Sequence, residues 1–146
     1  MPDPVVAAVF AKLGGRAALG TVVASEADLA RVVSNRIPLK VLRHVKRHGP
    51  LSNLEIQMFI IPARTQRHRV ARKEPLSIEE SDRLVRMTRT QALAEDVFGD
   101  TVKASRWLRE RLSELGDKPP LEVAQTGAGA RVVEQILAKI DWGAAA

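Results

Sequence analysis

A run of cationic and hydrogen-bonding side chains between residues 63 and 73, ARTQRHRVARK, carries the strongest chemical signal in the sequence. An arginine side chain can grip two acceptors of a guanine or of a phosphate, and a glutamine can bridge an adenine. A helix that carries both types could sit on a DNA backbone and read bases. The predicted base-reading residues, nearest the helix start, are Arg64, Thr65, Gln66 and Arg67, and the predicted backbone contacts are Arg69, Arg72 and Lys73.

The same run can also be interpreted as a solvated basic face, but two observations favour nucleic acid. Between Arg36 and Lys73, ten lysines and arginines face the single acid Glu55. A short helix from Ser52 is expected to end at Ile60-Ile61-Pro62, because a residue before proline is pushed out of the helical region. The basic run then becomes the second helix of a helix-turn-helix outline. Since the chain has three Phe and no Tyr, duplex DNA is favoured over single strands, which need aromatic stacking platforms.

Charge divides the chain into two halves of opposite character. Residues 1–75 hold 13 lysines and arginines against 5 acids, a net charge of +8, whereas residues 76–146 hold 10 against 12, a net charge of −2. Such asymmetry indicates that the two halves meet different partners and that the partner of the first half is a polyanion. We therefore expect a basic DNA-binding domain over residues 1–75 and a second domain over residues 76–146.

A long helix from Leu76 to Asp100 is expected to join the two halves. Ser77 and Glu80 have the spacing of a capping box, and Gly99 is free to adopt the left-handed conformation that ends helices. One side of this helix is expected to face solvent until Ala92, after which apolar residues spread around most of its circumference. We therefore expect the first part of this helix to pack against one domain and its last part to be buried in the second domain.

The remaining apolar residues recur at helical spacing and no segment alternates as a strand does, so the protein is predicted to be all-α. In the basic helix, Ala63, Val70 and Ala71 are the expected buried anchors. The predicted helices cover residues 4–13, 26–33, 38–48, 52–59, 63–73, 76–100, 100–111 and 121–124, and a last amphipathic helix starts at residue 126.

Catalytic, metal and cofactor sites are not expected, and neither is an enzyme. His44 and His48 lie four residues apart without an acid or third histidine nearby. The glycine-containing turn at residues 126–129 follows no strand and lacks the Gly-Lys-Ser/Thr of a phosphate-binding loop. The carboxylates of residues 79–82 have no histidine partner. The absence of cysteine and of an apolar run of about 18 residues favours a soluble protein of a reducing cytoplasm.

The two tryptophans are given different roles. Trp107 is predicted to fill the core of the second half. Trp142 lies at the end of the last amphipathic helix, where a large aromatic side chain can anchor another protein or pack back on its own domain. The sequence leaves both alternatives open for Trp142. The first helix is apolar and could serve dimerisation, so a homodimer is also expected.

The second half of the chain shows a pattern of residue types and spacings that extends well beyond one motif. The positions that carry it are Ala94, Val97-Phe98-Gly99-Asp100, Ala104, Trp107-Leu108, Pro120-Leu121, Thr126, Gly129-Ala130-Arg131, Val133-Glu134, Leu137, Ile140 and Gly143. Over residues 76–146 this pattern resembles the toxin-binding domain of the Xre/MbcA/ParS-like antitoxins, and residues 51–81 resemble the degenerate Xre-type helix-turn-helix of the same proteins. One departure is Arg109-Glu110-Arg111, where many relatives carry a Pro-Asn loop.

The resemblance implies a bacterial, cytoplasmic antitoxin of a RES–Xre toxin–antitoxin system. Such a protein would bind and block an NAD-consuming RES-domain toxin through residues 76–146, and would bind the promoter DNA of its own operon through residues 1–75. The contact with the toxin is expected to include the terminal segment 141–146. An alternative is a stand-alone transcriptional regulator whose second half dimerises or senses a ligand. The residues expected to bind the toxin are Trp107, Arg131, Glu134, Lys139, Asp141, Trp142 and Gly143.

Overall fold

The computed structural model describes residues 3–145, and this part of the chain is built from helices without a strand. An isolated antiparallel bridge between Leu112 and Lys118 is the sole β-type pairing in it. The all-α prediction is therefore confirmed. None of the described helices is both long and apolar enough to cross a membrane.

The helices follow the predicted order, and most begin and end within two residues of the predicted positions. Two short elements were not predicted, α2 after the Gly14-Gly15 turn and the 3-10 helix η1. Gly14 has a φ of 105°, so the chain reverses there and starts a new helix instead of continuing as a loop. The elements are α1 Pro4–Lys12, α2 Gly15–Leu19, α3 Glu26–Ser34, α4 Leu39–His48, α5 Asn53–Phe59, α6 Ala63–Arg72, α7 Ile78–Phe98, α8 Thr101–Arg109, η1 Ser113–Leu115, α9 Pro120–Val123 and α10 Gly127–Ala145.

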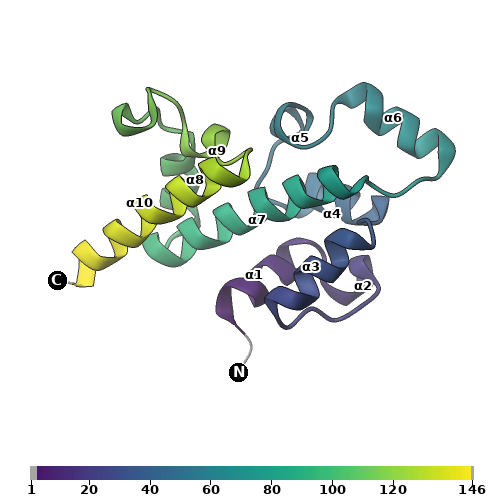
Figure 1. Cartoon of the computed structure of the whole chain (residues 1–146), viewed down its shortest axis with the longest axis horizontal. Helices are drawn as coiled ribbons and strands as arrows, with labels where there is room; N and C mark the ends of the chain where they lie inside the picture. Colours follow the sequence, from purple (N-terminus) through teal and green to yellow (C-terminus); the bar gives the residue numbers. More distant parts are fainter. Residues whose placement is uncertain (1–2, 146) are drawn as a thin grey trace.

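The long helix α7 runs through the middle of the protein (Figure 1), with α1 and α3 packed on one side and α8 and α10 on the other. Its start and end are as predicted. Ser77 and Glu80 form a complete capping box, and Gly99 ends the helix with a φ of 64°. The solvent-facing side of the first half is narrower than predicted, however, because Met87 is completely buried and Arg86 is half-buried. The reason is that α3 lies against the first half of α7, whereas Lys12 of α1 reaches Glu95 in the second half, which the sequence pattern alone did not reveal.

The start of α7 is also tied to the loop between α3 and α4. The backbone N–H of Ile37 donates to the Ser81 hydroxyl at 2.9 Å, and the N–H of Leu76 donates to the Ile37 carbonyl at 2.9 Å. Arg36 adds a bond from Nε to the Leu76 carbonyl at 2.9 Å. These contacts hold segments forty residues apart in the sequence, so the two predicted halves share one framework.

Ion pairs fix the helices that lie around α7. Lys12 Nζ of α1 lies 2.6 Å from Glu95 Oε1, and Arg89 pairs with Glu26 of α3 and, at 3.5 Å, with Glu134 of α10. A single arginine on α7 thus bridges one helix from the first half and one from the second. The apolar side of α1 is buried in the core of this protein, because Val6, Val9 and Leu13 are fully buried. That side is not free for the dimerisation considered from the sequence.

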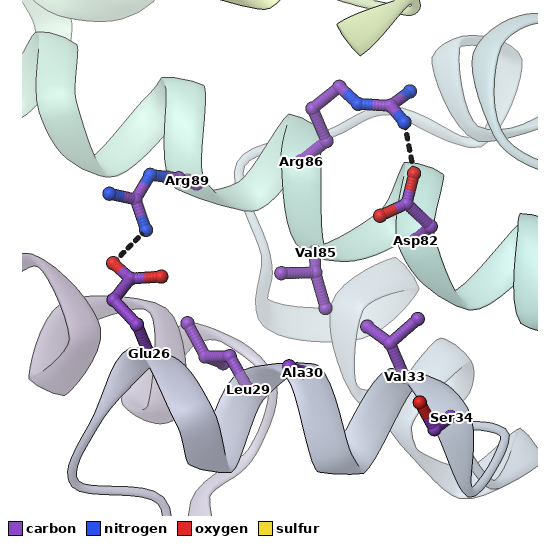
Figure 2. A pocket seen from close by; sticks show the side chains of 9 residues that line it. All are labelled: Glu26, Leu29, Ala30, Val33, Ser34, Asp82, Val85, Arg86 and Arg89. Atoms are coloured by element: carbon purple, nitrogen blue, oxygen red, sulfur yellow. Dashed lines mark hydrogen bonds and ion pairs between the residues drawn. The ribbon is translucent and has the colours of Figure 1, made fainter.

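A shallow groove separates α3 from α7 (Figure 2). Leu29 and Val85 contribute to its apolar lining, and the Glu26–Arg89 and Asp82–Arg86 ion pairs lie along its rim. Because both arginines are bonded to carboxylates of this chain, the groove carries no unsatisfied charge from these side chains.

Candidate functional site

The helices α5 and α6 form the predicted pair of short helices joined by a tight turn. Ser52 and Glu55 close a capping box at the start of α5. The helix ends at Ile60, and α6 starts directly after Pro62, whose missing N–H costs nothing at a helix start. The N–H of Ile61 donates to the Ile56 carbonyl at 2.9 Å. The turn is therefore short and hydrogen-bonded, and it fixes the direction in which α6 leaves α5.

The residues that hold α6 in place are not the predicted apolar anchors. Of the three predicted anchors, Ala63 is only half-buried, Val70 is 54% exposed and Ala71 is exposed, whereas Gln66 is 7% exposed. The Gln66 amide donates from Nε2 to the Ile61 carbonyl at 2.9 Å and accepts from Lys46 Nζ of α4. A buried amide is stable only when its polar atoms are bonded, and both are bonded here. Polar contacts thus replace the apolar stripe expected beneath this helix.

Arg69 is the second residue of α6 that turns inward. Its guanidinium lies 3.0 Å from Glu74 Oε2 and makes two bonds of 3.3 Å to the carboxylate of Glu80 on α7. Burial acts to raise the pKa of Glu80, but the Ser77 N–H and the Arg69 guanidinium outweigh it, so the pKa of this carboxyl lies below its usual value. Arg69 thereby fastens α6 to the capping box that starts α7.

The structure therefore divides the seven predicted DNA-binding residues into three groups. Gln66 and Arg69 are bonded within the protein and do not point to a partner, contrary to the expectation from the sequence. Thr65 is half-buried. The other four, which are exposed and take part in no ion pair among residues 3–145, are Arg64, Arg67, Arg72 and Lys73. His68 of the same helix is exposed as well.

A contact that the sequence did not indicate connects the two halves at Arg109, the last residue of α8. Its Nε and Nη2 each lie 2.9 Å from an oxygen of Glu55, and Nη2 also donates to the Pro50 carbonyl at 3.0 Å. Burial acts to raise the pKa of Glu55, but the bonds from Arg109 and the Ser52 N–H outweigh it and lower the pKa. Arg109 is the first residue of the segment that departs from the family pattern, and 54 residues separate it from Glu55.

The last helix, α10, packs on α7 and α9 through Val133 and Leu137, which are buried. Trp142 near its end is 79% exposed and does not pack back on its own domain. The predicted contact segment continues to residue 146, which lies outside the described residues. The other predicted toxin-contact residues that are exposed are Arg131, Lys139, Asp141 and Gly143.

Two of the residues predicted to contact a toxin have partners in this chain. Trp107 is half-buried and packs against Phe98, with ring centroids 5.6 Å apart. Glu134 is half-buried and pairs with Arg89. Both side chains therefore help to position α8 and α10 against α7.

Comparison with known proteins gives two family matches. Residues 28–89 match the antitoxin Xre-like helix-turn-helix domain, and residues 93–143 match the antitoxin Xre/MbcA/ParS C-terminal toxin-binding domain. The chain is 33% identical to Antitoxin Xre of Pseudomonas putida (strain KT2440) over 120 residues, which cover 82% of this chain and 75% of that protein. It is 25% identical to Antitoxin Xre of Photorhabdus laumondii over 79% of each chain. A protein of Sphingobium sp. (strain YBL2) named Prs ADP-ribosylating antitoxin is 31% identical over 55% of this chain and 56% of its own.

Replacing Glu80 by glutamine is expected to lower the free energy of unfolding at pH 7 by about 1–3 kcal/mol, because a charge-assisted contact is lost and Arg69 keeps one carboxylate partner. The pKa of Glu80 in the folded protein lies below the ordinary value of 4.5. The stabilisation is therefore complete above that value and is lost as the pH falls through the folded-state pKa. Urea unfolding of the wild type and the variant, at pH 7 and at lower pH, measures this difference in the free energy of unfolding. Glu79→Gln, an exposed neighbour on the same helix, is the control, and equal effects of both variants would contradict the assignment.

Replacing Arg109 by alanine is expected to loosen the start of α5, because the half-buried carboxylate of Glu55 loses its bidentate partner. Hydrogen exchange of the backbone amides of residues 53–56 should accelerate. The matched variant Arg106→Ala removes an exposed arginine of the same helix and should leave this exchange unchanged. If Arg109→Ala exchanged as slowly as the wild type, α8 would not be what holds α5.

Proposed function

The chain belongs to the Xre/MbcA/ParS-like antitoxin family, and on that premise we propose that it blocks an NAD-consuming RES-domain toxin by direct binding and represses its own operon by binding promoter DNA. The protein is an antitoxin of a toxin–antitoxin system and carries a helix-turn-helix domain. The proposed domains are residues 1–75 for DNA and residues 76–146 for the toxin. The helix α7 lies at the start of the second domain and packs against helices of both. The name of the Sphingobium relative links one antitoxin of this kind to ADP-ribosylation, a chemistry that consumes NAD.

The observation that carries the proposal is the separation of two exposed surfaces along α7. The helix α6, which carries the exposed cations, lies near one end of α7, and the end of α10 lies near the other (Figure 1). One protein can therefore hold DNA and a protein partner without the two competing for the same surface. This arrangement fits an adaptor with two partners better than a site for catalysis.

For the DNA half, we propose that α6 enters the major groove. Arg64 and Arg67 near its start are positioned to read base edges, with Thr65 beside them, while Arg72 and Lys73 contact phosphates. Gln66 and Arg69 take part indirectly, because they fix α6 against α4 and α7.

For the toxin half, we propose that the exposed side and end of α10 form the contact. Trp142 offers a large apolar surface at low cost in side-chain entropy, and such residues often dominate binding energy. Lys139 and Asp141 flank it with both signs of charge, and Arg131 extends the surface along the helix. The end of α10 would then lie near the nucleotide pocket of the toxin. Trp107 and Glu134 support this surface from beneath.

Replacing Trp142 by alanine is expected to weaken inhibition of the toxin encoded next to this gene by about 10-fold or more, since a buried aromatic anchor contributes roughly 2 kcal/mol or more. The measurement is NAD consumption by the purified toxin as a function of antitoxin concentration. Gln135→Ala, an exposed polar change on the same helix, is the control. Full inhibition by both Trp142→Ala and a variant lacking residues 141–146 would move the contact elsewhere.

Replacing Arg64 by alanine is expected to weaken promoter binding by about 1–3 kcal/mol, because a base contact is lost. The difference in affinity between promoter and scrambled duplexes should therefore become smaller. Arg72→Ala should weaken binding to both duplexes by the same factor and reduce the slope of log affinity against log salt concentration by about 0.9. Fluorescence anisotropy with labelled duplexes at several salt concentrations measures both effects. Promoter binding by both variants at the wild-type affinity would refute the assignment of α6.

A further inference from the structure

A second basic surface, on α4, is not explained by the roles described so far. The cations of this helix lie opposite its buried side, which consists of Val41, Leu42 and Val45. No acid interrupts the helix sequence LKVLRHVKRH. The exposed cations are Lys40, Arg43, Lys46 and Arg47.

Three of these four charges are not used to stabilise the fold. Lys40, Arg43 and Arg47 take part in no ion pair among residues 3–145, unlike the arginines that surround α7. Their spacing of three and four residues brings like charges together on one helix face, which destabilises a helix. The helix dipole disfavours Lys40 in the first turn and favours Arg47 in the last turn, so it does not offset the repulsion at Lys40 and Arg43. A surface that costs stability without an internal partner is the surface expected of a binding site.

The cations of α4 lie directly beside α6. Lys40 and Arg43 line one shallow groove together with Val70 and Lys73 of α6, and Lys46 lines a second groove together with Arg67. The bond between Lys46 and Gln66 fixes the two helices against each other. The positive surface of α6 therefore continues onto α4, and Glu74, the acid that also lines the first groove, is paired with Arg69.

The basic surface extends further on the other side of α4. Arg43 and Arg47 face Gly14, Ala17 and Ala18 across a third groove. These three residues are too small to cover the arginine side chains. The approach to this part of α4 is therefore open.

We propose that Lys40, Arg43 and Arg47 bind the phosphate backbone of the same DNA duplex, beside the groove that α6 enters. This inference rests on the proposed DNA binding by α6. Lys46 of α4 and Gln66 of α6 are bonded through their side chains, and the major groove is about 12 Å wide. A helix attached in this way to the side of the one that fills the groove lies toward the groove edge, where the phosphates are.

The chemistry of α4 fits phosphates better than bases or an acidic protein. Its exposed face carries lysines, arginines and histidines, and none of the asparagine, glutamine or serine side chains that read bases other than guanine. Its arginines could read guanine only from within the groove, which α6 is proposed to fill. Long flexible cations suit phosphate contacts, which add affinity without sequence preference. A face shared with α6 also suits one continuous polyanion better than a separate acidic partner.

The test compares the full-length wild type with a variant that combines Lys40→Gln, Arg43→Gln and Arg47→Gln. Each lost phosphate contact lowers the slope of log affinity against log salt by about 0.9, so three contacts lower it by roughly 2.7. Binding of promoter and scrambled duplexes should weaken by the same factor, so that their ratio is unchanged. Circular dichroism and thermal unfolding check the fold, and the three single variants, each lowering the slope by about 0.9, replace the combined one if it does not fold.

The matched control combines Lys103→Gln, Arg106→Gln and Lys118→Gln, which removes the same charge from exposed positions in the second half. A slope reduced equally in both triple variants, or unchanged in the α4 variant, would overturn the inference. Loss of toxin binding in the α4 variant with an unchanged DNA slope would also overturn it and assign the surface to the protein partner. If the Arg64 variant behaves as expected in these cases, DNA binding by α6 still stands. A wild type that binds neither duplex would overturn both proposals.

Discussion

The contact between Arg69 and Glu80 is the interaction on which the arrangement of the basic half depends. Glu80 belongs to the capping box of α7, and Arg69 lies near the end of α6, so one carboxylate starts a helix and fixes the orientation of another. Without this contact α6 would be held mainly by the buried Gln66 amide, because its apolar residues are largely exposed. A helix anchored by polar side chains leaves the rest of its circumference free for a partner.

The cations of the protein fall into two classes, those that are paired with a carboxylate of the chain and those that are not. Around α7, Arg86 and Arg89 lie beside carboxylates and serve the fold. On α4 and α6 the carboxylates are absent, so Arg43 and Arg64 remain without a bound acid among the described residues. Net charge alone does not distinguish these classes. The positions of the few acids of the first half decide which arginines are available to bind a polyanion.

The two halves proposed to bind DNA and the toxin expose separate surfaces but share one structural framework. α7 packs against helices from both, and Arg109 links the end of α8 to the start of α5 through Glu55. The helix-turn-helix therefore rests on a framework to which the toxin-binding half contributes. This explains why the family matches at residues 28–89 and 93–143 meet within a single helix instead of at a linker.

The sequence by itself determined the local features of this protein. Capping boxes at Ser52 and Ser77 and the left-handed end at Gly99 depend on residues within a few positions of one another, so helix boundaries and the all-α class could be predicted. The excess of base over acid between Arg36 and Lys73 also led to the proposed site for a polyanion. Only the tertiary structure decided which side chains of α6 face outward and that Arg109 supports α5. Those outcomes depend on partners 5 to 54 residues away, and the spacing of residues along one helix carries no information about a carboxylate on another.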